Sequence, residues 1–325
     1  MTKVLGIGNA LVDVMTLLPN DDLLHSLSFP KGSMQLIDEH TLRELTGKIS
    51  SFRQSCSSGG SAANTIHGLA CLGIETGFIG SVGRDEFGEI FRKDLMDNNI
   101  EPHLVYGKKE TGRAIALVSP DSERTFGTFL GAAIELSSVH LEKTTFDKYR
   151  YFHVEGYLVQ NRSLLEEALV LAKSSGLTIS LDMASFNVVT ANRDFLEHIL
   201  KEYVNIIFAN EEEAKSFTGK NPEESLAHLS ELCEIAVVKI GKDGSLIKRS
   251  VETARVGIIP VNPVDTTGAG DLYASGFLFG LMNGLSLEKS GEIGALLGGR
   301  VIEIVGSKMQ KEKWGDLRLA AKAML

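Results

Sequence analysis

Short β-branched or apolar runs alternate along this chain with longer amphipathic stretches, and this alternation restricts the fold more than any other feature. Such runs occupy residues 4–8, 76–81, 151–154, 178–182, 206–209 and 236–240. Several precede a helical pattern, as at 162–173, where apolar residues share one wide face of a helix. Strands that alternate with helices are typical of α/β proteins. The sequence therefore predicts a doubly wound, mostly parallel sheet flanked by helices.

Two segments, about 11–38 and 111–131, depart from this rhythm. The second contains extended stretches at 113–118 and 124–129, joined by the turn-like sequence SPDSE, which predicts an antiparallel hairpin. We expect both insertions to form a small β-rich lid on a single domain spanning residues 1–325. The C-terminal segment 308–325 predicts a helix that packs Trp314, Leu317 and Leu319.

Composition excludes several classes of function. The chain has 33 basic and 42 acidic residues, a formal net charge of −9, so a broad surface for nucleic acid or an anionic membrane is not expected. Its cysteines, Cys56, Cys71 and Cys233, form no CxxC pair, which argues against a disulfide framework or a zinc cluster. The N-terminus lacks a signal-peptide pattern, and no apolar run approaches the length of a membrane span. We expect a soluble, cytoplasmic protein.

The segment 264–281, VDTTGAGDLYASGFLFGL, carries the strongest chemical signal. Its glycines allow the backbone to approach a ligand closely, and the helix that follows begins with unpaired N–H groups at the positive end of its dipole. We expect Gly268, Ala269 and Gly270 to form an anion hole. Asp271 lies in the first helical turn, where the dipole should keep its carboxylate ionised. A carboxylate beside an anion hole suits phosphoryl transfer to a hydroxyl.

This segment resembles the second signature of the PfkB sugar kinase family, the ribokinase-like group that includes ribokinase, fructokinases and adenosine kinase. Residues 58–73, SGGSAANTIHGLACLG, are similar to the family's first signature. The segments GIGNALVDV, NEEEA and VVKIGKDGS also fall where the family places theirs, so the resemblance spans nearly the whole chain. It implies an ATP-dependent kinase that transfers the γ-phosphate to a hydroxyl of a sugar or nucleoside, with Asp271 as the base.

The resemblance also assigns the substrate side of the site. Gly59, Gly60 and Asn64 match the family's GG-x-x-x-N segment, which contacts substrate hydroxyls; an amide offers both the donor and the acceptor that a hydroxyl needs. Asp13 resembles the carboxylate that accepts hydrogen bonds from vicinal hydroxyls, and Asn9 is its weaker companion. Without the two signatures, a capping turn and a helix cap would be the preferred explanations of these residues.

The run of residues 210–213, NEEE, follows one of the apolar runs and opens a helix. Asn210 and Glu213 match the family's N-x-x-E pattern, and their spacing places both on one helical face. There they would organise Mg²⁺ largely through water, because Mg²⁺ retains much of its hydration shell. Glu211 and Glu212 are interpreted as a solvated face.

Two further groups are implied on the nucleotide side. Lys239, Gly241 and Gly244 lie in the segment VVKIGKDGS, which the resemblance places near the nucleotide. The same segment is equally typical of a hairpin turn with exposed lysines. Arg124, within SERTF of the lid, resembles a position from which some family members reach a phosphate when the lid closes, and the fixed donor fork of arginine suits that role.

The resemblance finally implies the cofactors. These are ATP and Mg²⁺, with K⁺ as a candidate for a further site. Asp265 and Thr267 match positions whose oxygens hold a monovalent cation in several family members, and the partner loop would lie near residues 301–306.

Other functions remain as alternatives. GIGNAL has Leu11 where the dinucleotide fingerprint GxGxxG requires its third glycine, which argues against an oxidoreductase. Walker and protein-kinase motifs do not occur. A ligand-binding regulator with little or no turnover remains the non-enzyme alternative. The layout of the insertions favours the adenosine kinase-like branch, but adenosine, ribose or a related sugar all remain open as the small-molecule partner. The resemblance fits either a monomer or a homodimer.

Overall fold

The computed structural model describes residues 3–121 and 123–325, and within these residues its centre is a nine-stranded sheet. The strand order is β14-β13-β12-β11-β10-β9-β1-β5-β6. All neighbouring strands pair in parallel except β12–β13 and β13–β14, which pair antiparallel. The strands are β1 (Lys3–Ile7), β5 (Glu75–Val82), β6 (Ile100–Tyr106), β9 (Tyr151–Glu155), β10 (Thr178–Asp182), β11 (Ile206–Asn210), β12 (Ile235–Lys239), β13 (Ser245–Arg249) and β14 (Glu252–Val256). The predicted parallel strands are confirmed.

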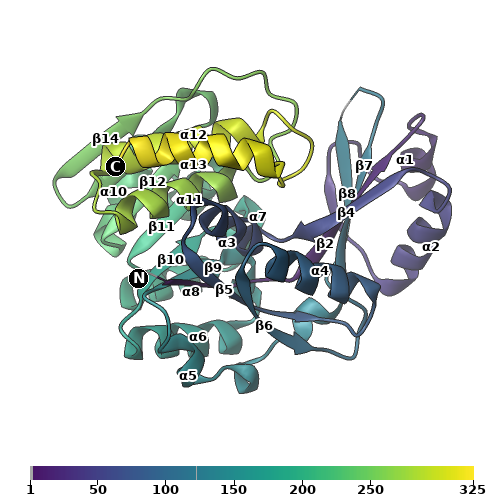
Figure 1. The fold of residues 1–325 in the computed structure, drawn as a ribbon, viewed down its shortest axis with the longest axis horizontal. Helices are drawn as coiled ribbons and strands as arrows, with labels where there is room; N and C mark the ends of the chain where they lie inside the picture. Colours follow the sequence, from purple (N-terminus) through teal and green to yellow (C-terminus); the bar gives the residue numbers. More distant parts are fainter. Residues whose placement is uncertain (1–2, 122) are drawn as a thin grey trace.

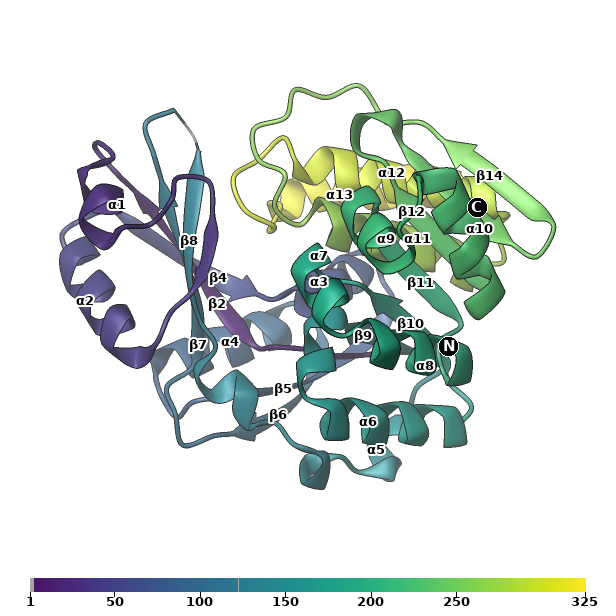
Figure 2. The same ribbon diagram turned by 180° about the vertical axis from the view of Figure 1, so that it is seen from behind.

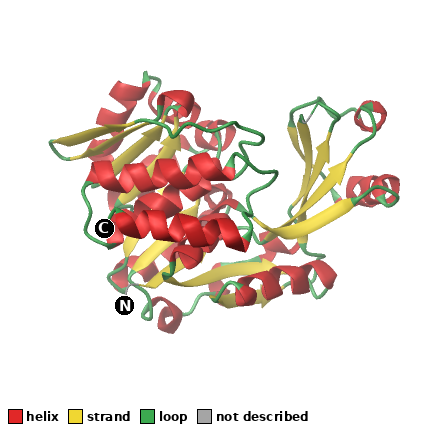
Figure 3. Cartoon of the chain, turned by 45° about the horizontal axis from the view of Figure 1, so that its top comes forward, coloured by secondary structure: helices red, strands yellow, loops and turns green. Residues whose placement is uncertain are grey.

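Helices cover both faces of this sheet (Figures 1 and 3). One face packs against α3 (Ser61–Leu72), α4 (Glu86–Asp97), α11 (Ala269–Met282), α12 (Leu287–Val301) and α13 (Lys311–Ala323). The other face packs against α5 (Lys143–Phe146), α6 (Arg162–Ser174), α7 (Phe186–Ala191), α8 (Arg193–Glu202), α9 (Glu211–Thr218) and α10 (Pro222–Leu232). Successive strand residues alternate between the two apolar clusters, Val4 and Leu5 for example, because side chains of a strand point to opposite faces. No helix among the described residues is both long and apolar enough to cross a membrane.

The chain builds this sheet outward from β1 in two directions, to β5 and β6 on one side and to β9 through β12 on the other. The strand order therefore reverses between β1 and β9. In such sheets ligands bind beyond the carboxyl ends of the strands at this reversal.

A second sheet stands apart from the first (Figure 2). Within the described ranges it has five strands in the order β3-β8-β7-β2-β4, with bounds β2 (Leu11–Leu17), β3 (Met34–Leu36), β4 (Gln54–Gly59), β7 (Gly112–Val118) and β8 (Arg124–Phe129). Helices α1 (Asp22–Leu27) and α2 (Glu39–Ile49) pack their buried leucines with the apolar side chains of β2 and β7. The expected hairpin of β7 and β8 is present and antiparallel.

This second sheet is larger than the predicted insertions, since β4 and α2 lie beyond residue 38. The sequence of β4, QSCSSG, carries no apolar alternation, so its pairing with β2 could not be read from the pattern. The second sheet is joined to the first by residues 8–10, between β1 and β2, and by residues 107–111, between β6 and β7, while Gly60 joins β4 to the start of α3.

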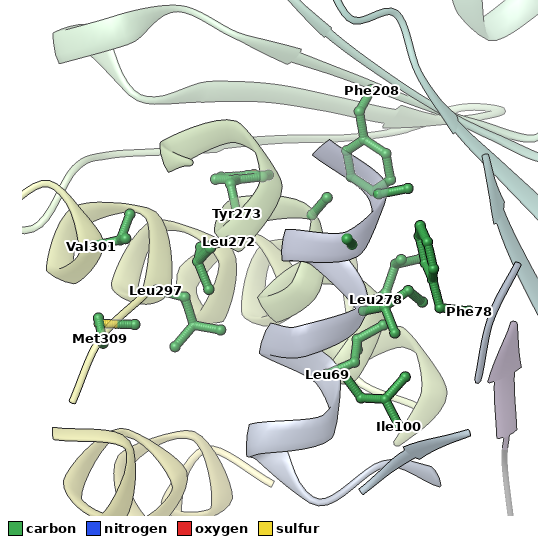
Figure 4. Packing of buried hydrophobic residues seen from close by; sticks show 14 of the residues in the cluster. Leu69, Phe78, Ile100, Phe208, Leu272, Tyr273, Leu278, Leu297, Val301 and Met309 are labelled. Carbon is green, nitrogen blue, oxygen red and sulfur yellow. The ribbon is translucent and has the colours of Figure 1, made fainter. Parts of the chain in front are cut away.

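Helix α11 is enclosed by the core and buried from Leu272 to Gly280. It lies between α3 and α12, and side chains from the three helices meet beneath the large sheet (Figure 4). The labelled side chains come from α3 (Leu69), α11 (Leu272, Tyr273, Leu278), α12 (Leu297, Val301), strands β5, β6 and β11 (Phe78, Ile100, Phe208) and the segment before α13 (Met309).

The predicted C-terminal helix is present as α13, but the prediction of which residues it packs was partly wrong. Trp314 and Leu317 are buried, whereas Leu319 is 70% exposed. Residues 314, 317 and 321 follow the helical repeat and face the core, while position 319 lies roughly opposite Leu317 around the helix axis.

The close approach of α11 to α12 gives a stability prediction. A Cβ atom added at Gly276 would lie 2.5 Å from the carbonyl oxygen of Ile293, so Gly276→Ala must push the two helices apart. We expect urea unfolding to show a loss of about 1–3 kcal/mol in the free energy of unfolding. The control is Gly315→Ala on the exposed side of α13, where nothing lies within 4 Å of the added methyl group. That change should gain about 0.5–1 kcal/mol from helix propensity, and equal effects of the two substitutions would contradict the close helix contact.

Candidate active site

A cavity of about 1340 Å³ lies between the second sheet and the carboxyl ends of β1 and β9. Its polar wall contains Asn9, Asp13, Asn64 and Glu155. Its remaining walls come from β3 and from the segments that follow β8, β9 and β10. The cavity therefore occupies the place where the strand order reverses.

Asp271 lies in the first turn of α11 and faces the start of α3. The Ser61 hydroxyl donates to Oδ1 of Asp271 (2.8 Å), and Nδ2 of Asn64 donates to Oδ2 (2.9 Å). Burial raises the pKa of Asp271 to about 6, while both hydrogen bonds oppose this rise. The dipole was expected to keep this carboxylate ionised, and desolvation brings its pKa closer to neutral pH. At neutral pH Asp271 is still mostly charged and close to its protonation midpoint, which suits a proton acceptor.

Asn64 is itself held in place from a distant segment. The Ser307 hydroxyl donates to Oδ1 of Asn64 (3.0 Å), which leaves the amide nitrogen oriented toward Asp271. Both ends of this amide are therefore bonded to protein groups. The residue predicted to contact substrate hydroxyls lines the cavity and also positions the Asp271 carboxylate.

The turn before α11 differs in one detail from the predicted anion hole. The N–H group of Ala269 donates to the carbonyl oxygen of Thr266 (3.2 Å). The N–H groups of Gly270 and Asp271 make no hydrogen bond to any residue in the described ranges. Gly268 has a φ of 77° and directs the chain into the helix. The N–H of Gly268 also makes no hydrogen bond within the described residues, so the free donors of this turn are Gly268, Gly270 and Asp271, but not Ala269.

Glu155 forms the floor of the cavity and is only 1% exposed. Its Oε1 accepts hydrogen bonds from the backbone N–H (3.2 Å) and Nδ2 (2.6 Å) of Asn9, and its Oε2 accepts from the N–H of Ala62 (3.3 Å). Burial raises the pKa of Glu155 to about 7, although these hydrogen bonds oppose the rise. Asn9 is therefore bonded to Glu155, and the pair forms one polar surface.

Asp13, on β2, reaches the same cavity from the second sheet. It faces Gly59 closely, since a Cβ atom at Gly59 would lie 2.2 Å from Oδ1 of Asp13. Burial raises the pKa of Asp13 to about 7, against the attraction of Lys308. Gly60 has a φ of 98°, and an added Cβ would lie 2.3 Å from the carbonyl oxygen of Asn9. Both glycines are thus required for the approach of the two sheets at the cavity.

Lys239, at the end of β12, lies on the other side of Asp271. Its Nζ donates to Oδ2 of Asp182 (2.8 Å), and a Cβ atom at Gly270 would lie 2.9 Å from the same nitrogen. Burial opposes the charge of Lys239, but the neighbouring carboxylates of Asp182 and Glu213 outweigh it and raise the pKa. The side chain is only 16% exposed, so Lys239 is not the exposed lysine of a simple hairpin.

Asn210 and Glu213 do lie on one face of α9, where they bond to each other. Glu213 accepts hydrogen bonds from the N–H (2.8 Å) and Nδ2 (2.7 Å) of Asn210, and Oδ1 of Asn210 accepts from the N–H of Glu213 (2.8 Å). Burial, and then the charge of Asp182, raise the pKa of Glu213 to about 7. Glu211 and Glu212 are both exposed, as expected for a solvated face.

The charges at this place fit a hydrated divalent cation. The carboxylates of Asp182, Glu213 and Asp271 influence one another, and Lys239 is the cation that offsets them. In the described part of the chain no group of three or more His, Cys, Asp or Glu residues converges as a metal site. A cation here would therefore be held largely by water and by a bound phosphate, as Mg²⁺ prefers.

The two glycines of the turn after β12 have different surroundings. Gly241 has a φ of 56° and only Glu211 within 4 Å of an added Cβ. Gly244 packs tightly, since its added Cβ would lie 1.9 Å from the carbonyl oxygen of Val256. Gly241 is therefore open to a ligand, whereas Gly244 closes the turn onto β14.

Arg124 connects the second sheet to the turn before α11. Its Nη1 donates to Oγ1 of Thr267 (3.1 Å) and forms an ion pair with Asp265. Asp265 also accepts hydrogen bonds from the N–H groups of Thr267 (3.0 Å) and Gly306 (2.6 Å). These bonds outweigh the effect of burial and lower the pKa of Asp265. The predicted partner loop is therefore present beside Asp265, but Asp265 and Thr267 both bond to a guanidinium.

Sequence reasoning missed four residues of the site: Ser61, Glu155, Asp182 and Ser307. Glu155 and Asp182 are the last residues of β9 and β10. Because ligands gather beyond the carboxyl ends of parallel strands, this position was a usable signal. Ser307 had no such signal, since its contact with Asn64 joins residues 243 positions apart.

Comparisons with known proteins agree on one family. The profile described as pfkB family carbohydrate kinase matches residues 34–313. The structure is similar to the crystal structure of a probable sugar kinase from Rhizobium etli CFN 42, with a TM-score of 0.89, 32% identity and 100% of both chains covered. The adenosine kinase from Sinorhizobium meliloti gives a TM-score of 0.88 at 32% identity, covering 100% of this chain and 99% of that one. An adenosine kinase from Schizophyllum commune is 25% identical over 345 residues, 98% of each sequence.

The hydrogen bond from Ser307 to Asn64 gives a prediction that requires no substrate. In Ser307→Ala the Asn64 amide loses its anchor, its donation to Asp271 weakens, and the charged form of Asp271 is less favoured. We expect carboxyl-carbon NMR titration to place the pKa of Asp271 higher than in the wild type. The control is Ser245→Ala, a buried serine bonded to Tyr273. An unchanged Asp271 titration in Ser307→Ala would contradict a positioning role for Ser307.

Proposed function

Since the chain belongs to the pfkB family of carbohydrate kinases, which are phosphotransferases acting on hydroxyl groups, we propose that Asp271 is its catalytic base and that its acceptor is a nucleoside such as adenosine. The position of Asp271 is the observation that supports its role as the base. Its carboxylate is in the first turn of α11, next to free N–H donors, and the cavity is lined by the Asn64 that orients it.

The proposed reaction uses these groups as follows. The acceptor hydroxyl lies against Asp271, which takes its proton as the new bond to the γ-phosphorus forms and the bond to the β-phosphate oxygen breaks. The N–H groups of Gly270 and Asp271, together with Lys239, stabilise the charge on the transferred group. Because phosphoryl transfer passes through a loose transition state, a carboxylate with a pKa of about 6 is a sufficient base.

The nucleotide side follows from the same geometry. Kinases of this family use ATP and typically Mg²⁺. We assign ATP to the side of Asp271 where Lys239 and Gly241 lie, and the hydrated Mg²⁺ to the carboxylates of Glu213 and Asp182. When bound, the metal ion supplies positive charge that screens the phosphate oxygens. Asn210 positions Glu213 for this role.

The acceptor is assigned from the lining of the cavity. Asn9, Asp13 and Glu155 form a polar surface near Asp271, which suits the hydroxyls of a ribose. Beyond it the walls are mixed: apolar side chains line the same cavity beside polar ones such as Gln35, Arg162 and Asn187, and the apolar set is Leu36, Leu130, Ile134, Leu158, Val188 and Ala191. A free pentose would leave these side chains against water, whereas a purine base would cover them. The adenosine kinases among the similar proteins support the same assignment.

The second sheet is assigned as a lid. It supplies Asp13 to the acceptor and Arg124 to the turn before α11, so its closure would complete the site. The outer face of this sheet is covered by α1 and α2 of the same chain. This supports a monomer, since a dimer formed through that face would have to displace both helices.

A substrate panel tests the acceptor. With Mg²⁺ and ATP, we expect adenosine to give ADP release with the highest kcat/KM, and free ribose or hexoses to be poor acceptors. The matched variant is Ile134→Asp, which places a charge on the apolar wall and should raise the KM for the nucleoside far more than that for ATP. Preference for a free sugar would overturn the nucleoside assignment. Binding of adenosine without turnover would favour the regulator alternative.

Replacing the base tests the chemical step. Asp271→Asn should keep ATP and acceptor binding while kcat falls by about 10²–10⁴-fold, because general base catalysis contributes that much. The matched control is Asp316→Asn on the exposed face of α13, which should leave kcat unchanged. Turnover near that of the wild type in Asp271→Asn would remove the carboxylate as the base.

The raised carboxyl pKa values predict the pH dependence. Asp271 acts as the anion, so kcat/KM should fall as pH drops through about 6, where this group takes up a proton. Asp13 and Glu155, each with a pKa near 7, lie in the same cavity and protonate over the same range. The acid limb should therefore be steeper than that of one proton, and a flat profile down to pH 5 would contradict a basic role for Asp271.

A further inference from the structure

The site that resembles a monovalent-cation site in related kinases is bonded here to an arginine of the same chain. Asp265 and Thr267 are the residues that the resemblance assigns to the cation, and the loop that ends at Gly306 lies beside them. In both residues a side-chain oxygen contacts Nη1 of Arg124, namely Oδ2 of Asp265 and the hydroxyl of Thr267. We propose that the Arg124 guanidinium takes the place of the monovalent cation, so that this protein needs no K⁺.

The first argument is that most acceptor positions of the carboxylate are already used. Oδ1 of Asp265 accepts the N–H of Thr267, while Oδ2 accepts the N–H of Gly306 and pairs with Arg124. The side chains of Arg124 and Asp265 are only 9% and 5% exposed. These three donors use three of the about four acceptor positions of the carboxylate, and water has little access to complete the coordination of a metal ion.

The second argument is charge. One guanidinium and one carboxylate form a neutral pair in a buried place, which is the arrangement that such charges require. A K⁺ ion added beside Arg124 would put two positive charges against one carboxylate, and their repulsion is strong where solvent is excluded. The oxygens of Asp265 and Thr267 can therefore bind either the guanidinium or the ion, but not both.

The third argument is what the arginine does that an ion cannot. Asp265 and Thr267 lie directly before the turn that leads to Gly270 and Asp271, so the pair orders the turn that presents the free N–H donors. Arg124 comes from β8 of the second sheet. An exchangeable ion would order the turn alone, whereas Arg124 makes the order of the turn depend on the position of the second sheet.

Thermal unfolding of the ligand-free protein tests this proposal without any assumption about its substrate. The melting temperature is measured in KCl, NaCl and choline chloride at equal ionic strength. For the wild type we expect the same melting temperature in all three salts. Arg124→Ala leaves the Asp265 carboxylate without its ion-pair partner, so this variant should melt several degrees lower than the wild type in choline chloride. Its melting temperature should recover in KCl, because K⁺ fills the position that the guanidinium vacates.

Two matched variants make the result specific. Arg113 is a buried arginine of the same sheet, 8% exposed and paired with Glu110. Arg113→Ala should therefore also lower the melting temperature, but by the same amount in KCl, NaCl and choline chloride. The double variant Arg124→Ala with Asp265→Asn should lose the recovery in KCl, since it lacks the carboxylate. Recovery that survives in the double variant would place the ion elsewhere and overturn the proposal.

If Arg124→Ala does not fold, the measurements on the wild type still test the proposal. A higher melting temperature in KCl than in choline chloride, or turnover that rises with K⁺ at constant ionic strength, would show that the intact site takes an ion and would overturn the proposal. Absence of any KCl-specific recovery in folded Arg124→Ala would overturn it as well. Because melting requires neither ATP nor acceptor, these outcomes are separate from failure of the proposed kinase reaction.

Discussion

The contact between the start of α3 and the start of α11 is the constraint on which the rest of the site depends. Ser61 and Asn64 on α3 donate to the two carboxylate oxygens of Asp271 on α11. The helices are joined further by Thr65 and Ser275, which bond to the backbone carbonyls of Asp271 and Thr65 respectively. The two helix starts come from opposite ends of the sequence, so the carboxylate is positioned by packing of the core. An enclosed α11 makes this packing rigid, since it is buried along most of its length.

A second set of contacts relates the small sheet to the same helix. Asp13 reaches the acceptor cavity, while Arg124 pairs with Asp265 before the turn of α11. The short connections at residues 8–10 and at Gly60 leave the sheet attached at the carboxyl end of β1. Movement of the small sheet would therefore change the acceptor wall and the anion-binding turn together. The same movement of the small sheet would exclude water and order the turn, which suits a reaction that must avoid hydrolysis of ATP.

Much of the fold and part of the site could be predicted from local pattern. The parallel strands, the β7–β8 hairpin and the turn at 268–271 each carry their signal within a few residues. Leu319 was wrongly predicted to be buried, because its position on the helix faces away from the buried Leu317. Strand β4 was missed because its residues are mostly polar. The raised pKa of Asp271 could not be foreseen for a different reason. The helix dipole is visible in the sequence, but burial by the opposite helix is not, and burial is the larger effect.

The sequence by itself determined the class of chemistry, because the glycines, the carboxylate and the helix start that create an anion-binding turn are consecutive residues. Only the tertiary structure decided how those groups are tuned. Ser307 meets Asn64 across 243 positions, and Arg124 meets Thr267 across 143. Contacts at such separations depend on how helices and sheets pack, and they set the pKa of Asp271, the proposed base, and the hydrogen-bond partners of Asp265 and Thr267. Local sequence specifies which groups are present, whereas packing specifies their partners and their charge.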